Sequence, residues 1–512
     1  MSWGSVVRDA FRLLPERVQV FDTTLRDGEQ TPGVSLRKEE KVEVARALAE
    51  LGVAVIEAGY PAVSRGEHEA VREISRLGLG PKVCALARCD RRDIDRAVDA
   101  GVDWVHVFIA TSEIHMRHKL RMTPEQVYEA AVESVEYAKS RGVEVHFSCE
   151  DATRSERSFL LRVYKGAAEA GADSLDVPDT VGVAIPLVMR ELARQVREAT
   201  GLPVAVHCHD DMGLATANTI AGVEGGAEIV HVTVNGIGER AGNASLEEVV
   251  VALKVLYGVD SGIDLSKLAA VSRLVSSLTG MVVQRNKAVV GDHAFSHESG
   301  IHVHGVINNP LTYEPIAPEL VGKRRRIVVG KHSGTHAVVE VLRQHGFELD
   351  LEEGKRVLER VKELADTGAR LTEQLLLGLV RDDPSLVSSQ PLEVISVSLR
   401  ADGREVSGEV EVFLRGERVT GFGRGRSPVS ASISAVANVV SRVLGPVEVV
   451  ECSVYVPPNP DRCPAEAEVV LRFNGSTLVG RGLAHDPAMA VAMAVGGAVS
   501  QALSMRTGGD GS

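Results

Sequence analysis

The sequence lacks any apolar run long enough to cross a bilayer, and charged residues such as Arg8, Arg12 and Glu16 interrupt the apolar start that a signal peptide would need. Positive charge is also scarce. The formal net charge is −13, whereas binding to a phosphate backbone needs a basic face. We therefore expect a cytoplasmic protein that has no membrane and no nucleic acid among its partners.

Pairing motifs of cysteine are absent as well. The 6 cysteines of this 512-residue chain are scattered without a Cys-x-x-Cys pair, which argues against structural zinc and against a disulfide framework. One basic run, residues 323–326, is interpreted as a solvated turn, with a contact to an anionic cofactor as the alternative.

Short runs rich in Val and Ile alternate with segments of helical periodicity along the first half of the chain. Eight strand–helix units in about 250 residues match the size of a closed (β/α)8 barrel in the α/β class. A doubly wound sheet is the alternative, but no Gly-rich dinucleotide fingerprint follows the first strand. The predicted strands are residues 18–24, 53–60, 82–87, 104–111, 143–149, 174–178, 203–209 and 229–234.

The pattern changes near Gly258, where helical segments begin, and again after Pro384, where alternating strands begin. Two Gly-Arg-Gly strings, at residues 423–425 and 480–482, each precede a helix of small residues. Two copies of a strand-strand-helix unit predict a small α+β domain with a regulatory or dimerising role. The predicted divisions are an N-terminal extension (1–17), a catalytic barrel (18–275), helical linker subdomains (276–385), a C-terminal regulatory domain (386–505) and a disordered tail (506–512).

His207 and His209 stand two apart in a predicted strand, so both imidazoles face the barrel interior and can share one metal ion. A hydrogen-bonded pair of core histidines is the alternative. Barrel closure brings the first strand beside the eighth, so Asp27 could add a carboxylate and Asn243 a neutral oxygen. Two imidazoles and one carboxylate leave positions open for a bidentate substrate, which favours a metal site.

Other polar residues follow the same strand ends. Arg26 could hold a carboxylate or stabilise an enolate oxygen, or it could pair with Glu29 or Asp151. Glu150 could transfer protons or pair with Arg26, and Thr180 could bind a substrate carboxylate or cap the next helix.

Four histidines fall within residues 292–305. We expect one of them to act at the barrel mouth as a general acid or base, because a neutral imidazole titrates near pH 7. A second metal site and a cluster of surface histidines are the alternatives. The four are His293, His297, His302 and His304.

Four strings of residues resemble the isopropylmalate, citramalate and homocitrate synthase family. They are residues 22–30 (DTTLRDGEQ), the His-x-His pair, residues 235–243 (NGIGERAGN) and residues 299–302 (SGIH). The resemblance covers nearly the whole chain, and its C-terminal part looks like the leucine-sensing dimer domain of that family.

The resemblance implies a Claisen-type condensation of acetyl-CoA with a 2-keto acid. By this likeness Asp27, His207 and His209 would bind a divalent cation (Mg²⁺, Mn²⁺ or Zn²⁺), with Asn243 adjacent. The cation would polarise the keto group, and Thr180 would bond the substrate carboxylate.

The resemblance also implies the proton-transfer groups. Arg26 would stabilise the developing oxygen charge, Glu150 with His302 would remove a proton from the acetyl methyl, and Tyr313 resembles a helper tyrosine. The family is dimeric, so we expect a homodimer in which His302 reaches the barrel of the other subunit.

The resemblance implies that Leu86, His106 and Ser148 line the pocket for the side chain of the keto acid, and so determine which keto acid binds. A small Ser148 leaves room for a branched side chain and favours 2-ketoisovalerate over pyruvate. A citramalate-forming enzyme is the main alternative, and a homocitrate-forming enzyme or an acyl-CoA lyase is less favoured. Where the family usually shows Gly-Pro-Val-Asp-Ala, residues 427–431 read SPVSA, which leaves leucine inhibition in doubt.

Overall fold

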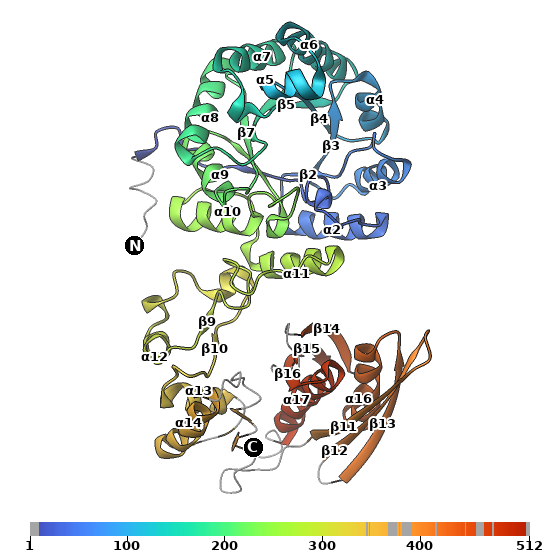
Figure 1. Ribbon diagram of the computed structural model, residues 1–512, viewed down its shortest axis with the longest axis vertical. Coiled ribbons are helices and arrows are strands. Elements are labelled where there is room, and N and C mark those ends of the chain that lie inside the picture. The colour runs from blue at the N-terminus through green and yellow to red at the C-terminus, as the bar shows by residue number, and fades with distance from the viewer. Residues whose placement is uncertain are drawn as a thin grey trace. The chain divides into compact units, whose positions relative to one another are not determined.

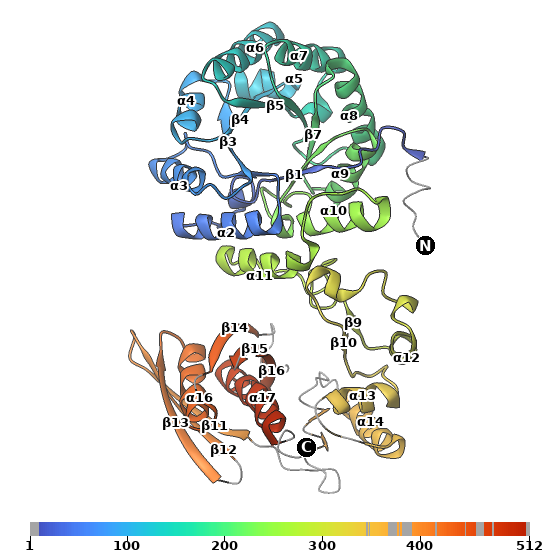
Figure 2. The same cartoon turned by 180° about the vertical axis from the view of Figure 1, so that it is seen from behind.

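The computed structural model describes residues 10–344, 347, 349–366, 376–377, 379–380, 392–414, 417–445, 447–456, 465–473 and 476–507. They form two compact units, and the first comprises Met1–Phe295 with Ile316–Arg325 (Figures 1 and 2). The second comprises Ser296–Pro315 with Arg326–Ser512. Most of the tail predicted to be disordered, residues 508–512, lies outside the described residues. The domain boundaries drawn from the sequence stay predictions.

The first unit is a closed barrel of eight parallel strands, in sequence order, which confirms the predicted fold class. β1 pairs with β2 on one side and β8 on the other, so the sheet has no free edge. Each strand overlaps one of the predicted runs. The bounds are β1 (Gln19–Asp22), β2 (Val55–Glu57), β3 (Lys82–Arg88), β4 (Trp104–Ala110), β5 (Glu144–Glu150), β6 (Ser174–Asp179), β7 (Val204–Cys208) and β8 (Ile229–Val232).

Helices surround the barrel, as Figure 1 shows. α6 illustrates why they form where they do: Thr123 and Gln126 make a reciprocal capping box, Pro124 occupies the first turn, and one apolar face is buried. The helices of the first unit are α2 (Lys38–Leu51), α3 (Arg65–Arg76), α4 (Arg91–Asp99), α5 (Glu113–His115), α6 (Pro124–Ser140), α7 (Arg157–Glu169), α8 (Pro186–Thr200), α9 (Ala215–Glu224), α10 (Leu246–Ala252) and α11 (Leu268–Thr279).

The barrel interior changes from apolar to polar along the strands. Phe21, Trp104 and Ile229 belong to a small apolar cluster inside the barrel. Beyond it, buried imidazoles and carboxylates point inward, whereas Val105 and Val107 of β4 pack in the core between strands and helices. Cys208 belongs to that outer core too, as its position between the two histidines predicts. The polar layer carries the candidate site.

The segment predicted as a helical linker contains helices and also a short parallel pair of strands, which the sequence did not indicate. Val338, Leu342, Val357 and Leu358 are part of its own core. The elements are β9 (Ser296–His297), α12 (Gly300–Asn308), β10 (Arg326–Ile327), α13 (Thr335–Gln344) and α14 (Leu351–Asp366).

The C-terminal region repeats one unit twice, as the Gly-Arg-Gly strings predict, but each copy has three antiparallel strands before its helix, not two. The strings have a packing reason: a Cβ on Gly423 would lie 2.2 Å from the backbone nitrogen of Ala435, and one on Gly482 would lie 1.8 Å from Ala490 O. The first copy is β11 (Leu392–Ala401), β12 (Val406–Leu414), β13 (Glu417–Gly425) and α16 (Pro428–Leu444). The second is β14 (Glu448–Tyr455), β15 (Ala465–Phe473), β16 (Ser476–Ala484) and α17 (Pro487–Thr507).

Among the described residues, no helix combines the length and the apolar composition needed to cross a membrane.

Candidate metal centre

Three side chains converge at the carboxyl ends of β1 and β7. The Nε2 atoms of His207 and His209 lie 3.3 Å apart, and Asp27 Oδ2 lies 3.4 Å from the first and 3.7 Å from the second. All three residues are buried. Two histidines that only hydrogen-bond to each other in the core would need no carboxylate beside them. The presence of Asp27 therefore favours a metal ion shared by the three side chains.

The protonation states of His209 and Asp27 suit the binding of a cation between them. Burial, with His207 next to it, lowers the pKa of His209 to about 4, so its imidazole is neutral at pH 7. Its Nδ1 lies 3.2 Å from Gly242 O, and donation there leaves a lone pair on Nε2, the nitrogen that lies near His207 and Asp27. Burial opposes ionisation of Asp27, but Arg26 and the two histidines hold its pKa well below the ordinary value. Neutral imidazoles and an ionised carboxylate are the forms that bind metals.

Asn243 completes the group from the loop after β8. Its Nδ2 donates to Asp27 Oδ1 at 3.1 Å and to Ile237 O, whereas its Oδ1 is buried without a hydrogen-bond partner. An orphaned buried carbonyl oxygen costs free energy unless something meets it. The residues therefore fit a divalent ion held by two imidazoles and one carboxylate, with an amide oxygen available beside them.

Arg26 lies against this group and pairs with neither Glu29 nor Asp151. Its Nη1 contacts Asp27 Oδ2 at 2.8 Å, and its Nε contacts Glu57 Oε2 at 2.7 Å. Glu57 comes from the end of β2 and is fully buried. Glu57 is not among the site residues predicted from the sequence, although a lone acid inside the apolar run VAVIEAGY is a signal of a buried functional carboxylate.

Glu150 ends β5, where it contacts Lys119 and His115 and not Arg26. Lys119 Nζ lies 2.6 Å from its carboxylate, and His115 Nδ1 lies 3.7 Å from it. Thr180 does not cap the following helix, whose N-cap is Ile185. Its hydroxyl accepts a hydrogen bond from the Asp151 backbone instead.

The three residues expected to line the substrate pocket are buried in the barrel, Leu86 on β3, His106 on β4 and Ser148 on β5. His106 and Ser148 are hydrogen-bonded to each other, and Ser148 Oγ is also hydrogen-bonded to Asp176 Oδ2 at 2.6 Å. Asp176, on β6, is a second residue of the site that was not predicted from the sequence. His106, His146 and Asp176 could form another ligand group, but their imidazole nitrogens already have side-chain partners.

His302 and Tyr313 belong to the second unit, where their rings stack with centroids 3.9 Å apart. His297 contacts Glu314 at 3.1 Å, and His304 is exposed. Within the described part of the chain, the two groups of converging ligand atoms lie in the barrel and include none of these histidines.

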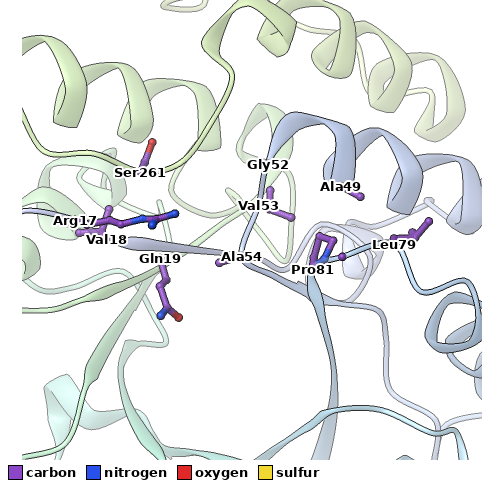
Figure 3. Close-up of a pocket in the computed structure, with 11 residues that line it drawn as sticks. Arg17, Val18, Gln19, Ala49, Gly52, Val53, Ala54, Leu79, Pro81 and Ser261 are labelled. Carbon is purple, nitrogen blue, oxygen red and sulfur yellow. The ribbon is translucent and has the colours of Figure 1, made fainter.

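A cavity of about 470 Å³ opens beside Asn243, lined by the loop after β8 and by residues 281–284 and 286–288 among others. Another, of about 340 Å³, lies at the opposite end of the barrel, where Arg17, Gln19, Val53 and Pro81 mark the starts of β1, β2 and β3 (Figure 3). Its lining contains no carboxylate and no imidazole, so it offers no ligand set of the kind found around Asp27.

Known proteins resemble the chain over both units. The pattern of the HMGL-like family matches residues 17–275, and that of the homocitrate synthase post-HMGL domain-like family matches residues 289–369. A probable 2-isopropylmalate synthase of Methanopyrus kandleri is 50% identical, over 93% of this chain and 96% of its own length. A homocitrate synthase of the same organism is 54% identical over 73% of this chain and 95% of its own length. An (R)-citramalate synthase of Methanocaldococcus jannaschii is 48% identical over 83% of this chain and 87% of its own.

Proposed function

The chain belongs to the HMGL-like family, among its isopropylmalate, citramalate and homocitrate synthases, and from this premise we propose that it condenses acetyl-CoA with 2-ketoisovalerate. The products are 2-isopropylmalate and CoA, and the reaction is the first committed step of leucine biosynthesis. The observation that carries the proposal is the convergence of Asp27, His207 and His209, with the orphaned Asn243 Oδ1 beside them, at the mouth of the barrel.

A divalent cation, Mg²⁺, Mn²⁺ or Zn²⁺, would be held by Asp27, His207 and His209 near Asn243, and when bound it would polarise the keto group. Around it, Thr180 is proposed to bond the substrate carboxylate. Arg26 is proposed to donate to the keto oxygen as negative charge develops there. Its guanidinium lies against Asp27, one of the proposed metal ligands, and so would lie beside a keto acid bound to the metal.

Carbon–carbon bond formation needs a base that removes a proton from the acetyl methyl. Glu150 is the proposed base in the barrel, where its carboxylate lies 2.6 Å from Lys119 Nζ. His302 and Tyr313 are proposed to assist proton transfer on the strength of the family resemblance. Hydrolysis of the thioester then makes the condensation irreversible.

The identity of the 2-keto acid is proposed from the residues expected to line the substrate pocket, Leu86, His106 and Ser148. Both hydrogen-bonding directions of the Ser148 hydroxyl are used within the barrel, toward His106 and Asp176. The small side chain therefore offers space without a free polar group, which suits an alkyl substituent better than the carboxylate of 2-ketoglutarate.

The test follows CoA release from acetyl-CoA with Mg²⁺ or Mn²⁺ and compares 2-ketoisovalerate, pyruvate and 2-ketoglutarate. We expect the highest kcat/KM with 2-ketoisovalerate. A preference for pyruvate would identify a citramalate synthase and contradict the proposed pocket. No release with any of the three would contradict the condensation itself.

We also propose a cytoplasmic homodimer with leucine as effector of the C-terminal region. Ser430, which replaces the Asp of the family string, makes a capping box with Ser427 at the start of α16. Light scattering of the purified chain checks the dimer, and a leucine titration of the condensation rate checks the effector. A monomer, or a rate unchanged by leucine, would contradict the corresponding part.

A further inference from the structure

Arg26 is held from two sides by carboxylates. Its Nε donates to Glu57 at 2.7 Å, and its Nη1 donates to Asp27 at 2.8 Å. A guanidinium is planar and carries five N–H groups in a rigid fork, so fixing two of its nitrogens also fixes the direction of the third. The third, Nη2, makes no hydrogen bond to any described residue, which leaves it for a substrate oxygen.

Glu57 is itself immobilised. The Thr23 hydroxyl donates to Oε2, and His106 Nδ1 lies 2.7 Å from Oε1. Burial opposes ionisation of Glu57, but Arg26 and His106 hold its pKa far below the ordinary value, so the carboxylate can only accept hydrogen bonds. His106 must therefore carry a proton on Nδ1.

Arg26, Glu57 and His106 thus form a row of hydrogen-bonded side chains, and this row continues through the barrel to Asp176. Ser148 lies between His106 Nε2 and Asp176 Oδ2, but it has one hydroxyl proton for two neighbours. Either His106 donates to Ser148 and Ser148 to an ionised Asp176, or the same bonds run in reverse from a protonated Asp176. Each arrangement satisfies every contact and holds one proton between His106 and Asp176, which makes the row rigid.

We propose that Glu57 is a positioning residue for Arg26, and that His106, Ser148 and Asp176 keep Glu57 in place. The proposal rests on the proposed role of Arg26 in the condensation. Glu57 touches no reacting atom in this scheme. It sets the direction in which Nη2 meets the developing oxygen charge, and a donor acts at full strength only when it is aimed in advance.

The first test substitutes Glu57→Gln. Glutamine has nearly the same shape but one accepting oxygen, so it cannot accept from both Arg26 Nε and His106 Nδ1. We expect kcat to fall about 10²-fold, as for loss of an aimed donor, while KM for the keto acid and the Kd for Mn²⁺ change less than about threefold. A kcat within threefold of the wild type, or a parallel loss of Mn²⁺ affinity, would overturn the proposal.

The second test combines Glu57→Gln with Arg26→Ala. If Glu57 acts through Arg26, the double variant is as slow as Arg26→Ala alone, to within about threefold. Additive losses would show that Glu57 acts independently and would overturn the inference. A fully active Arg26→Ala would instead contradict the proposed role of Arg26, so the two failures can be told apart.

Asp93→Asn is the matched control, because Asp93 is also a buried carboxylate that accepts from an arginine Nε, that of Arg88 at 2.6 Å, away from Asp27. We expect it to leave kcat unchanged.

A measurement on the unsubstituted protein covers the case in which Glu57→Gln does not fold. Nitrogen-15 NMR of histidine-labelled enzyme, with His106 assigned from a His106→Gln variant, reports the protonation of each imidazole nitrogen. We expect Nδ1 of His106 to be protonated, with its proton slow to exchange because the residue is buried. An unprotonated Nδ1 would overturn the proposed row.

Discussion

At the scale of single residues, burial and close neighbours determine which groups are charged in the candidate metal centre. His209 is buried beside His207, and its pKa falls to about 4, whereas Arg26 keeps the neighbouring Asp27 ionised. His209 and Asp27 therefore present lone pairs at neutral pH without any conformational change. Because these ligands are already ordered and already in the protonation state that binds a metal, little free energy is spent on rearranging them when an ion binds.

The first prediction concerns His207→Ala, which removes one of the two imidazoles facing Asp27. We expect the affinity for Mn²⁺ and the condensation rate each to fall by about 10²-fold or more, because two ligands hold a hard cation much less tightly than three. Titration calorimetry with Mn²⁺ measures the first effect. His304→Ala, at an exposed histidine, serves as the control, and wild-type affinity in His207→Ala would exclude a metal at this position.

The second prediction concerns Asp22, a buried carboxyl on β1 whose pKa burial raises to about 7. Between its ordinary pKa of 3.8 and about 7 the folded state binds the proton that the unfolded state releases. Its contribution to the free energy of unfolding therefore falls as pH rises through that window. Asp22→Asn should stabilise the fold at pH 8 by up to roughly 4 kcal/mol, and much less at pH 4.5.

Urea unfolding of both proteins at the two pH values checks this prediction, since the other titrating groups cancel in the difference. An equal effect of Asp22→Asn at both pH values would show that Asp22 is already ionised in the folded state at the lower pH.

At the scale of elements, the loop after β8 returns Asn243 to Asp27, and its backbone makes this possible. Asn235 and Arg240 both have a positive φ, 63° and 55°. Gly238 packs so closely that an added Cβ would lie 2.1 Å from Asn243 Nδ2 and 3.0 Å from Asp27 Oδ1. Glycine at this position is therefore a requirement of the site and not of the strand before it.

The third prediction is that Gly238→Ala displaces Asn243 or Asp27 and lowers Mn²⁺ affinity and kcat together, by about tenfold or more. Calorimetry and the CoA-release assay measure both. Gly66→Ala is the comparison, because a Cβ at that α3 position meets nothing closer than 3.9 Å and should be neutral. If Gly238→Ala kept normal affinity for Mn²⁺, Asn243 and Asp27 would not need their present contact.

At the scale of the whole molecule, the chain has several hydrophobic cores. The barrel core includes residues from β1 to α11, and the C-terminal repeats share a core to which both copies contribute, with Val436 from α16 and Val491 from α17. Because the two copies bury their helices in one cluster, the C-terminal repeats should unfold as a single cooperative region.

The fourth prediction tests this division with Val491→Ala, which removes two buried methyl groups. We expect the C-terminal repeats to lose about 2 kcal/mol of unfolding free energy, including the strands of the first copy, while Mn²⁺ binding in the barrel stays unchanged. Hydrogen exchange measured by mass spectrometry locates the loss. Exchange that increases only in the second copy would show that the two copies unfold separately.

The sequence by itself determined much about this protein. Strand runs that alternate with helical periodicity identified the barrel, and the two-residue spacing of His207 and His209 placed both rings on one face. Strings such as residues 22–30 indicated the family. These features could be predicted because each depends on local order along the chain, in which side-chain direction follows from the backbone period alone.

Tertiary structure alone decided which side chains meet. Glu57 lies 31 residues from Arg26 along the chain, and Lys119 lies 31 residues from Glu150. No local sequence pattern can predict contacts at such separations. The strand number of each C-terminal copy likewise exceeded the prediction. The physical reason is that partners across a barrel depend on closure, strand register and side-chain reach, and these are set by packing the whole core at once.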